Sequence, residues 1–144
     1  MFYLICRSIP NQVKKNISVV IRIYPCKIKE VAFYMELEQL TERIIGCAYT
    51  VANTLGNGFL ERVYENALAH ELKKQYLQVE QQKAIPVYYD QIVVGEYVAD
   101  LLVEGSVLVE LKAAKDIDLQ QEITMLYNVQ TCEITGVFTI TPWR

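Results

Sequence analysis

The chain has 144 residues, of which 52% are hydrophobic and 22% are charged, and its formal net charge is −3. This length suits one domain with its own hydrophobic core, and the composition excludes wholesale disorder. No apolar run approaches the roughly 18 residues needed to span a bilayer, and the charge order at the N-terminus is not that of a secretory signal, so we expect a cytoplasmic protein that does not enter a membrane.

Charge is distributed unevenly along the chain. Residues 1–34 carry six basic and one acidic residue, whereas residues 35–144 carry eight basic and sixteen acidic residues. An acidic globular part argues against a protein that coats nucleic acid without specificity, because such proteins bind the phosphate backbone through clustered Lys and Arg. The four cysteines show no C-x-x-C spacing, so neither a zinc site nor a disulfide framework is indicated, and we expect reduced thiols.

The first 34 residues share no clear pattern with the rest of the chain. Within them, "NISVVIRIY" could form a strand, but no neighbouring segment offers it an obvious partner. Met35 is a candidate initiator methionine, and a regular helical pattern begins at it. We therefore predict an N-terminal extension over residues 1–34, either mis-called or disordered, and a folded domain over residues 35–144.

Two amphipathic helices are predicted next. The first begins at Met35 and ends before Gly56, a typical C-terminal stop. Its apolar residues recur at steps of three and four: Leu37, Leu40, Ile44, Ala48, Val51 and Leu55. The second runs from about 59 to about 75. Its predicted buried face consists of Leu60, Val63, Tyr64, Ala67, Leu68 and Leu72.

Beyond the second helix the apolar pattern changes from the helical period to alternation. Three strands are predicted, "KAIPVYYD", "IVVGEYVADLLV" and "SVLVELKA", separated by turns at Asp90-Gln91 and Glu104-Gly105. A helix at about 117–130 and a last strand, "TGVFTI", complete the order α, α, β, β, β, α, β. This order predicts an α/β or α+β fold with a central mixed sheet flanked by helices.

Charged residues interrupt the second and third of these strands. Glu110 and Lys112 lie two apart and therefore share a face of their strand. A three-residue loop over 104–106 would place Asp100 directly opposite Glu110, with Cβ atoms about 4.5–5.5 Å apart, whereas a two-residue loop would place Glu110 on the opposite face. Three-residue loops with a left-handed glycine are common, and Gly105 suits that position.

Two carboxylates at this distance repel by about 3 kcal/mol at an effective dielectric near 20. A shared proton, the ammonium of Lys112 or a divalent cation would offset the repulsion, and Mg²⁺ or Mn²⁺ prefers such hard oxygens. With Lys112 orienting or deprotonating a water, this is the chemistry of metal-dependent phosphodiester hydrolysis. The alternative is an edge strand whose charges face solvent and prevent aggregation. The residues alone leave both interpretations open.

A further motif opens the second helix, where "GNGFLERVYENAL" contains Gly58-x-x-Glu61-x-x-Tyr64. It resembles the signature of the GxxExxY protein family, a branch of the PD-(D/E)xK nuclease superfamily. The resemblance extends over about residues 36–115 and includes "IPVYYD", "VVGEYVADLLVE" and "VLVELKAAK". It implies a restriction-endonuclease-like core.

In that superfamily an acidic residue on the helix before the sheet, an Asp on one strand and E-x-K on the next strand build a site for Mg²⁺ or Mn²⁺. The resemblance therefore implies a catalytic set whose first three members hold the metal: Glu61, Asp100, Glu110 and Lys112. A Gln before the first strand often belongs to the family pattern, and Gln82 matches it better than Gln81.

Local physical chemistry agrees with part of this motif. Gly58 can adopt backbone angles closed to other residues, and Glu61 lies in the first helical turn, where the helix dipole favours a carboxylate. The alternatives are ordinary charge placement for Glu61 and, for Tyr64, a core aromatic whose hydroxyl is hydrogen-bonded.

Beyond "KAAK" the chain departs from the pattern that the resemblance implies, so the domain reads as diverged or truncated at its C-terminus. We predict a metal-dependent nuclease acting on DNA or RNA, in a size class where homodimers are common. The rival prediction is a catalytically inactive nuclease fold that serves as a nucleic-acid-binding or protein-interaction module. The intact acidic and basic set favours the enzyme, whereas the acidic charge and the altered C-terminus favour the rival.

Overall fold

A computed structural model describes residues 18–23, 31–112 and 136–141 of the chain. The elements are β1 (Ser18–Ile23), α1 (Val31–Leu55), α2 (Glu61–Lys74), β2 (Val79–Tyr89), β3 (Ile92–Val103), β4 (Val107–Leu111) and β5 (Gly136–Thr141). The three strands predicted after the second helix and the last strand are all present. The helix predicted at about 117–130 lies outside the described residues.

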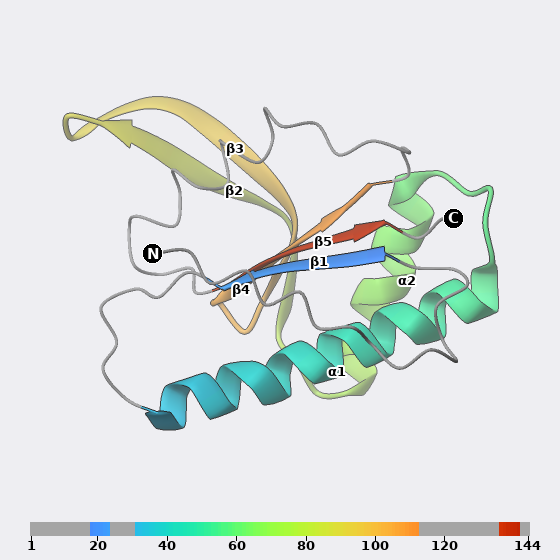
Figure 1. The fold of residues 1–144 in the computed structure, drawn as a ribbon. Coiled ribbons are helices and arrows are strands. Elements are labelled where there is room, and N and C mark those ends of the chain that lie inside the picture. Colours follow the sequence, from blue (N-terminus) through green and yellow to red (C-terminus); the bar gives the residue numbers. More distant parts are fainter. Residues whose placement is uncertain (1–17, 24–30, 113–135, 142–144) are drawn as a thin grey trace.

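The strands form one sheet in the order β1-β5-β4-β3-β2 (Figure 1). β4 and β5 run parallel, and the other neighbouring pairs run antiparallel. The sheet is therefore mixed, which confirms the predicted α+β class. In the described part of the chain, neither helix is long and apolar enough to cross a membrane.

The N-terminal strand β1 lies at one edge of the sheet. It pairs antiparallel with β5 along its whole length, from Ser18 opposite Thr141 to Ile23 opposite Gly136. The sequence suggested a strand here without a partner because the partner stands at the other end of the chain. The pairing brings part of the predicted N-terminal extension into the sheet.

Helix α1 begins at Val31, four residues before the predicted start at Met35. No Gly or Pro stands between these positions to interrupt the helix. Its C-terminus is as predicted: Gly56 adopts a φ of +67°, and its N–H donates to the carbonyl of Ala52 at 2.9 Å. The apolar stripe of α1 is buried or partly buried along its length.

The buried face of α2 was predicted only in part. Tyr64, Leu68 and Leu72 are buried as expected, but Leu60 is 79% exposed and Val63 is 38% exposed. Leu60 has an extended backbone and precedes the first helical turn, so the helical period does not apply to it. The buried face of α2 therefore differs from the predicted one. It includes a carboxylate, Glu65, which is only 3% exposed.

The larger core cluster joins the two helices to one face of the sheet. Its sheet residues alternate along the strands and comprise Leu101, Val103, Val107, Val109 and Leu111. A smaller cluster consists of Ala99, Leu102 and Leu108, with Ile85 and Tyr97 packed against it. Cys47 belongs to the larger cluster, and its thiol is free, as predicted.

The loop between the helices is closed by Tyr64. Its hydroxyl donates to the carbonyl of Gly56 at 2.9 Å and accepts from the N–H of Phe59 at 3.2 Å. The Phe59 and Tyr64 rings meet edge to face, with centroids 6.1 Å apart. Gly58 supplies a φ of +106° in this loop. The interpretation of Tyr64 as a core aromatic with a satisfied hydroxyl is therefore confirmed.

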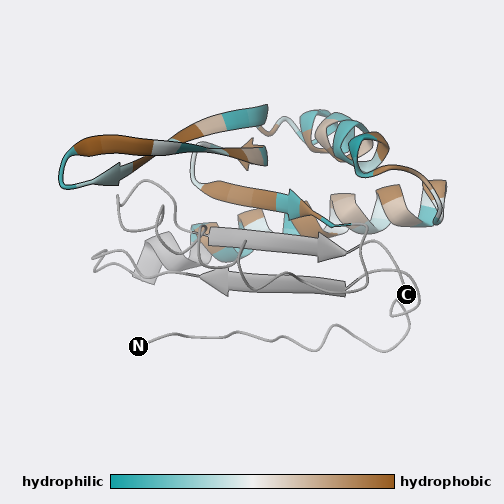
Figure 2. Ribbon diagram, turned by 90° about the horizontal axis from the view of Figure 1, so that it is seen from above, coloured by the Kyte–Doolittle hydropathy of each residue, from teal (hydrophilic) through white to brown (hydrophobic). Residues whose placement is uncertain are grey.

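Strands β2 and β3 continue past the rest of the sheet as a twisted hairpin arm, which we define as residues 84–98 (Figures 1 and 2). Its exposed large hydrophobic residues are Tyr88, Tyr89, Ile92, Val93, Val94 and Val98. Among the described residues, this part of β3 pairs only with β2, because the pairing with β4 begins at Leu101.

Removal of residues 1–34 tests the structural role of β1. We expect a chain beginning at Met35 to melt at a temperature at least about 5 °C lower than the full chain, because β5 loses its antiparallel neighbour and α1 loses its first turn. Differential scanning calorimetry measures this shift. Identical melting of the two proteins would instead support the prediction that residues 1–34 are an extension.

Substitution of Tyr64 by Phe tests the loop closure. The variant leaves the carbonyl of Gly56 and the N–H of Phe59 without the hydroxyl, so we expect a loss of about 1–2 kcal/mol in the free energy of unfolding by urea. The matched control is Tyr76→Phe, since Tyr76 is 95% exposed. Equal stability of Y64F and the wild type would show that the hydroxyl does not hold the loop.

Candidate active site

The turn between β3 and β4 sets the register of the charged residues. The pairs are Leu101 with Val109, Leu102 with Leu108 and Val103 with Val107. The strands are joined by the three-residue loop 104–106, in which Gly105 has a φ of +64°. The predicted loop length is therefore confirmed, and the next pair in this register is Asp100 with Glu110.

At this next position the two strands no longer pair through their backbones. The N–H of Leu111 donates to Oδ2 of Asp100 at 2.8 Å, and the N–H of Asp100 approaches Oε1 of Glu110 at 3.4 Å. Each carboxylate thus accepts from a backbone N–H of the opposite strand. The side chains take over hydrogen bonds that backbone carbonyls accept in a regular ladder.

Glu110 is buried in this position, with 4% of its surface exposed. The hydroxyl of Tyr97 donates to Oε1 of Glu110. The pKa of Glu110 is raised from 4.5 to about 7, chiefly by burial and also by the charge of Asp100, while the hydrogen bonds from Tyr97 and the Asp100 N–H and the Lys112 ammonium act in the opposite direction. Glu110 is therefore a carboxyl group that can be either protonated or ionised near neutral pH.

Asp100 is half-buried at the same level of the hairpin. Burial raises its pKa, and the negative charges of Glu65 and Glu61 act in the same direction. The N–H of Leu111 and the ammonium of Lys112 lower it. Because Lys112 lowers the pKa of both Asp100 and Glu110, its ammonium lies within electrostatic reach of both carboxylates.

Glu65 joins α2 to this site and was missed by the sequence analysis. Its Oε1 accepts from the amide of Gln81 at 3.0 Å, and its Oε2 accepts from the amide of Gln82 at 2.9 Å and contacts Arg62 at 3.4 Å. The sequence contained a signal for it, since Glu65 shares one helical face with the buried Ala69 and Leu72. A carboxylate on an apolar face requires partners when buried.

Gln82 links this helix carboxylate to the strand carboxylate, because its amide also approaches Oδ1 of Asp100 at 3.4 Å. Neighbouring side chains of a regular strand point to opposite faces, yet Gln81 and Gln82 both reach Glu65. The left-handed backbone of Gln82, with a φ of +51°, makes this possible. Such a conformation costs a non-glycine residue about 1–3 kcal/mol and is typical of functional sites.

Glu61, the acidic residue predicted from the motif, lies in the first turn of α2, as expected. It is exposed, and it is near enough to raise the pKa of Asp100. The structure thus places Asp100 and Glu110 together at the end of the β3–β4 ladder, with Glu61 and Lys112 near enough to act on Asp100 by their charges. Of the two glutamines that were weighed, both contact Glu65 but only Gln82 approaches Asp100.

The chemistry of the donors fits a hard divalent cation, since two carboxylates with raised pKa values lie side by side across two strands. Within residues 31–112 and the two short described strands, no three Asp, Glu, His or Cys side chains lie close enough to hold a metal ion by themselves. Mg²⁺ commonly binds through one or two carboxylates and completes its shell with water and substrate phosphate. The site therefore suits a cation that is shared with a substrate.

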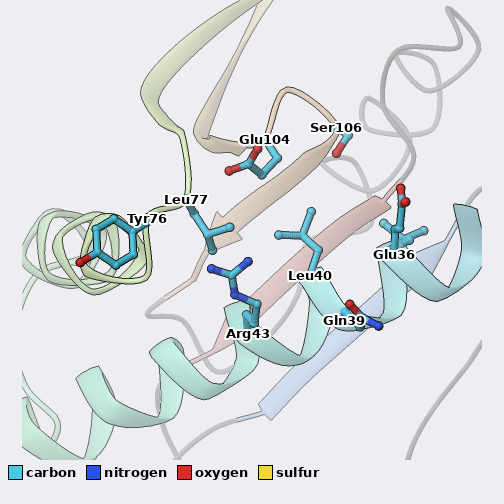
Figure 3. Close-up of a pocket in the computed structure, with 9 residues that line it drawn as sticks. Glu36, Gln39, Leu40, Arg43, Tyr76, Leu77, Glu104 and Ser106 are labelled. Carbon is cyan, nitrogen blue, oxygen red and sulfur yellow. The ribbon is translucent and has the colours of Figure 1, made fainter.

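A separate hollow of about 390 Å³ lies near the turn end of the hairpin (Figure 3). It is lined by α1, by Tyr76 and Leu77, and by Glu104 and Ser106 of the β3–β4 turn. Arg43 stands beside it, and its guanidinium donates to the carbonyl of Gln75. The carboxylates lie at the opposite end of the β3–β4 ladder, so this hollow is not part of the candidate site.

The raised pKa of Glu110 predicts how stability depends on pH. The unfolded chain releases the proton near pH 4.5 and the folded chain near pH 7, so the folded state holds more protons between these values and loses stability as the pH rises. Glu110→Gln removes this titration. We measure the free energy of unfolding by urea in EDTA. The value for E110Q minus the value for the wild type should rise by on the order of 3 kcal/mol between pH 4.5 and pH 7.

The control for this measurement is Glu96→Gln, which changes an exposed carboxylate on the neighbouring strand β3. E96Q reports the effect of replacing an exposed carboxylate by an amide, and the change with pH seen in E110Q should exceed it. A stability difference between E110Q and the wild type that stays constant with pH would mean that Glu110 titrates in the folded protein as it does in the unfolded chain.

Comparisons with known proteins identify the family. A family model described as the PD-(D/E)XK nuclease superfamily matches residues 38–137, which is more than half of the chain. Searches of curated proteins and of solved structures gave no significant match. The matched region contains both helices from residue 38 onward and every residue of the candidate site. The chain therefore belongs to the PD-(D/E)XK nuclease superfamily.

Proposed function

We propose that this protein is a nuclease of the GxxExxY branch, which hydrolyses phosphodiester bonds of DNA or RNA with the help of Mg²⁺ or Mn²⁺. The observation that carries the proposal is the position of Asp100 and Glu110, which face each other where the β3–β4 ladder ends and each accept a backbone N–H of the opposite strand. The assignment to the branch rests on the motif of Gly58, Glu61 and Tyr64.

Asp100 and Glu110 would hold the cation, and Glu61 would complete or orient its shell. The chemistry that a bound divalent cation supplies is polarisation of the phosphate and stabilisation of the leaving oxygen. Binding would also relieve the cost of two adjacent negative charges, one buried and one half-buried. The charge of Asp100 raises the pKa of Glu110, so the two carboxylates lie close together, which supports a shared ligand.

Lys112 would position or deprotonate the attacking water. Its ammonium lowers the pKa of both carboxylates, which supports a role beside them. An ammonium next to two carboxylates can also neutralise part of the charge that develops on the phosphate during the reaction.

Glu65 would position the site and is not proposed to contact the substrate. It is buried and holds the amides of Gln81 and Gln82, and the second amide approaches Asp100. This chain of contacts fixes Asp100 relative to α2. Partners that orient metal ligands in this way are part of the function of such sites.

The second candidate function is an inactive nuclease fold that binds nucleic acid or another protein. One observation favours it: oxygens of both carboxylates already accept hydrogen bonds from the protein, from Leu111 and Gln82 at Asp100 and from Tyr97 and Asp100 at Glu110. A site satisfied in this way can remain folded without a metal. The cytoplasmic location and the homodimer expected from the sequence stay predictions.

Cation binding separates the two functions. We expect Mg²⁺ or Mn²⁺ at about 100 times its dissociation constant to stabilise the wild type by about 2.7 kcal/mol, seen as a rise in melting temperature. Asp100→Asn should abolish the rise, and Glu96→Gln, which removes an exposed carboxylate from the same strand, should retain it.

The matching activity assay uses single- and double-stranded DNA and RNA with Mg²⁺ and with Mn²⁺. We expect cleavage by the wild type and by E96Q, and a loss of at least about a hundredfold in E110Q and in Lys112→Ala. A wild-type protein that gains no stability from either cation and cleaves none of the substrates would establish the inactive fold.

A further inference from the structure

Tyr97 contacts Glu110 directly, and the sequence analysis assigned it no part in the site. It stands three residues before Asp100 on β3, opposite Ile85 of β2. Its ring is half-buried and packs with Ile85 against the smaller core cluster of Ala99, Leu102 and Leu108. Packing on this side fixes the direction in which the hydroxyl points.

The hydroxyl of Tyr97 donates to one oxygen of Glu110, Oε1. The N–H of Asp100 approaches the same oxygen at 3.4 Å. Both contacts that the structure gives to this carboxylate from the described residues therefore fall on Oε1, and none of them involves Oε2. Two donors on one oxygen hold the plane of a carboxylate and leave its second oxygen to another partner.

We propose that Tyr97 is a positioning residue that presents Glu110 to the divalent cation, an inference that rests on the proposed cation site. The cation would bind Glu110 through the oxygen that Tyr97 does not contact. Carboxylates that ligate metals are themselves commonly hydrogen-bonded, and removal of such a partner typically costs about 10–100-fold in metal affinity. Tyr97 supplies this bond from the strand that also carries Asp100.

The experiment measures Mn²⁺ binding by isothermal titration calorimetry, without a nucleic acid substrate. We expect Tyr97→Phe to weaken Mn²⁺ binding by at least about tenfold, because the ring stays in place and only the hydroxyl is lost. The matched control is Tyr88→Phe, since Tyr88 lies on the hairpin arm and is 48% exposed. Its Mn²⁺ affinity should equal that of the wild type.

A second pair of variants separates positioning from general loosening of the fold. Glu110→Asp shortens the side chain and withdraws its carboxylate from the hydroxyl. If Tyr97 acts through Glu110, Tyr97→Phe should weaken Mn²⁺ binding little further in the E110D protein than in E110D alone. Thermal unfolding in EDTA checks that each variant is folded, and Tyr97→Met, which fills the space without a donor, replaces Y97F if that variant does not melt cooperatively.

Two results would overturn the inference while leaving the proposed function intact. One is a Y97F protein that binds Mn²⁺ within about threefold of the wild type. The other is an equal loss of affinity from Y97F with and without E110D, which would place the action of the hydroxyl elsewhere. A wild-type protein that binds no Mn²⁺ would overturn the proposed function, and the inference with it.

Discussion

The structure depends on two carboxylates that face each other where the β3–β4 ladder ends. Asp100 and Glu110 accept hydrogen bonds from backbone N–H groups of the opposite strand, so the hairpin stays closed although its backbones no longer pair there. Burial raises the pKa of both groups, and the negative charge of Asp100 adds to the rise at Glu110. Two apolar side chains at this position would be buried at a lower cost in free energy, so the arrangement indicates a functional site.

The elements around this pair hold it from separate directions. From α2, Glu65 binds the two glutamines of β2, and Gln82 adopts a left-handed backbone so that both amides can reach it. From β3, Tyr97 donates to Glu110 while its ring packs in the smaller core cluster. Glu65 and Glu110 are the buried members of these contacts, and the loss of a hydrogen bond at either carboxylate would leave a buried oxygen unsatisfied, which favours one geometry.

The helix motif has a structural explanation that differs from residue to residue. Gly58 supplies a backbone angle for the loop, and Tyr64 closes that loop through its hydroxyl. The loop fixes where α2 begins, and the first two turns of α2 carry Glu61 and Glu65. Two of the three motif residues therefore act on the site by placing the helix, and only Glu61 lies near enough to act on Asp100 by its charge.

The sequence by itself determined the features that depend on near neighbours. Alternation along the strands and a three-residue turn at Gly105 placed Asp100 opposite Glu110, and the helical period located most of the core. Only the tertiary structure decided the features that join distant segments: the pairing of β1 with β5, the contact of Tyr97 with Glu110 and the network of Glu65 with Gln81 and Gln82. Periodicity in the sequence predicts which face of an element is buried. A buried polar group also needs hydrogen-bond partners, and these come from distant segments that only the folded chain brings together.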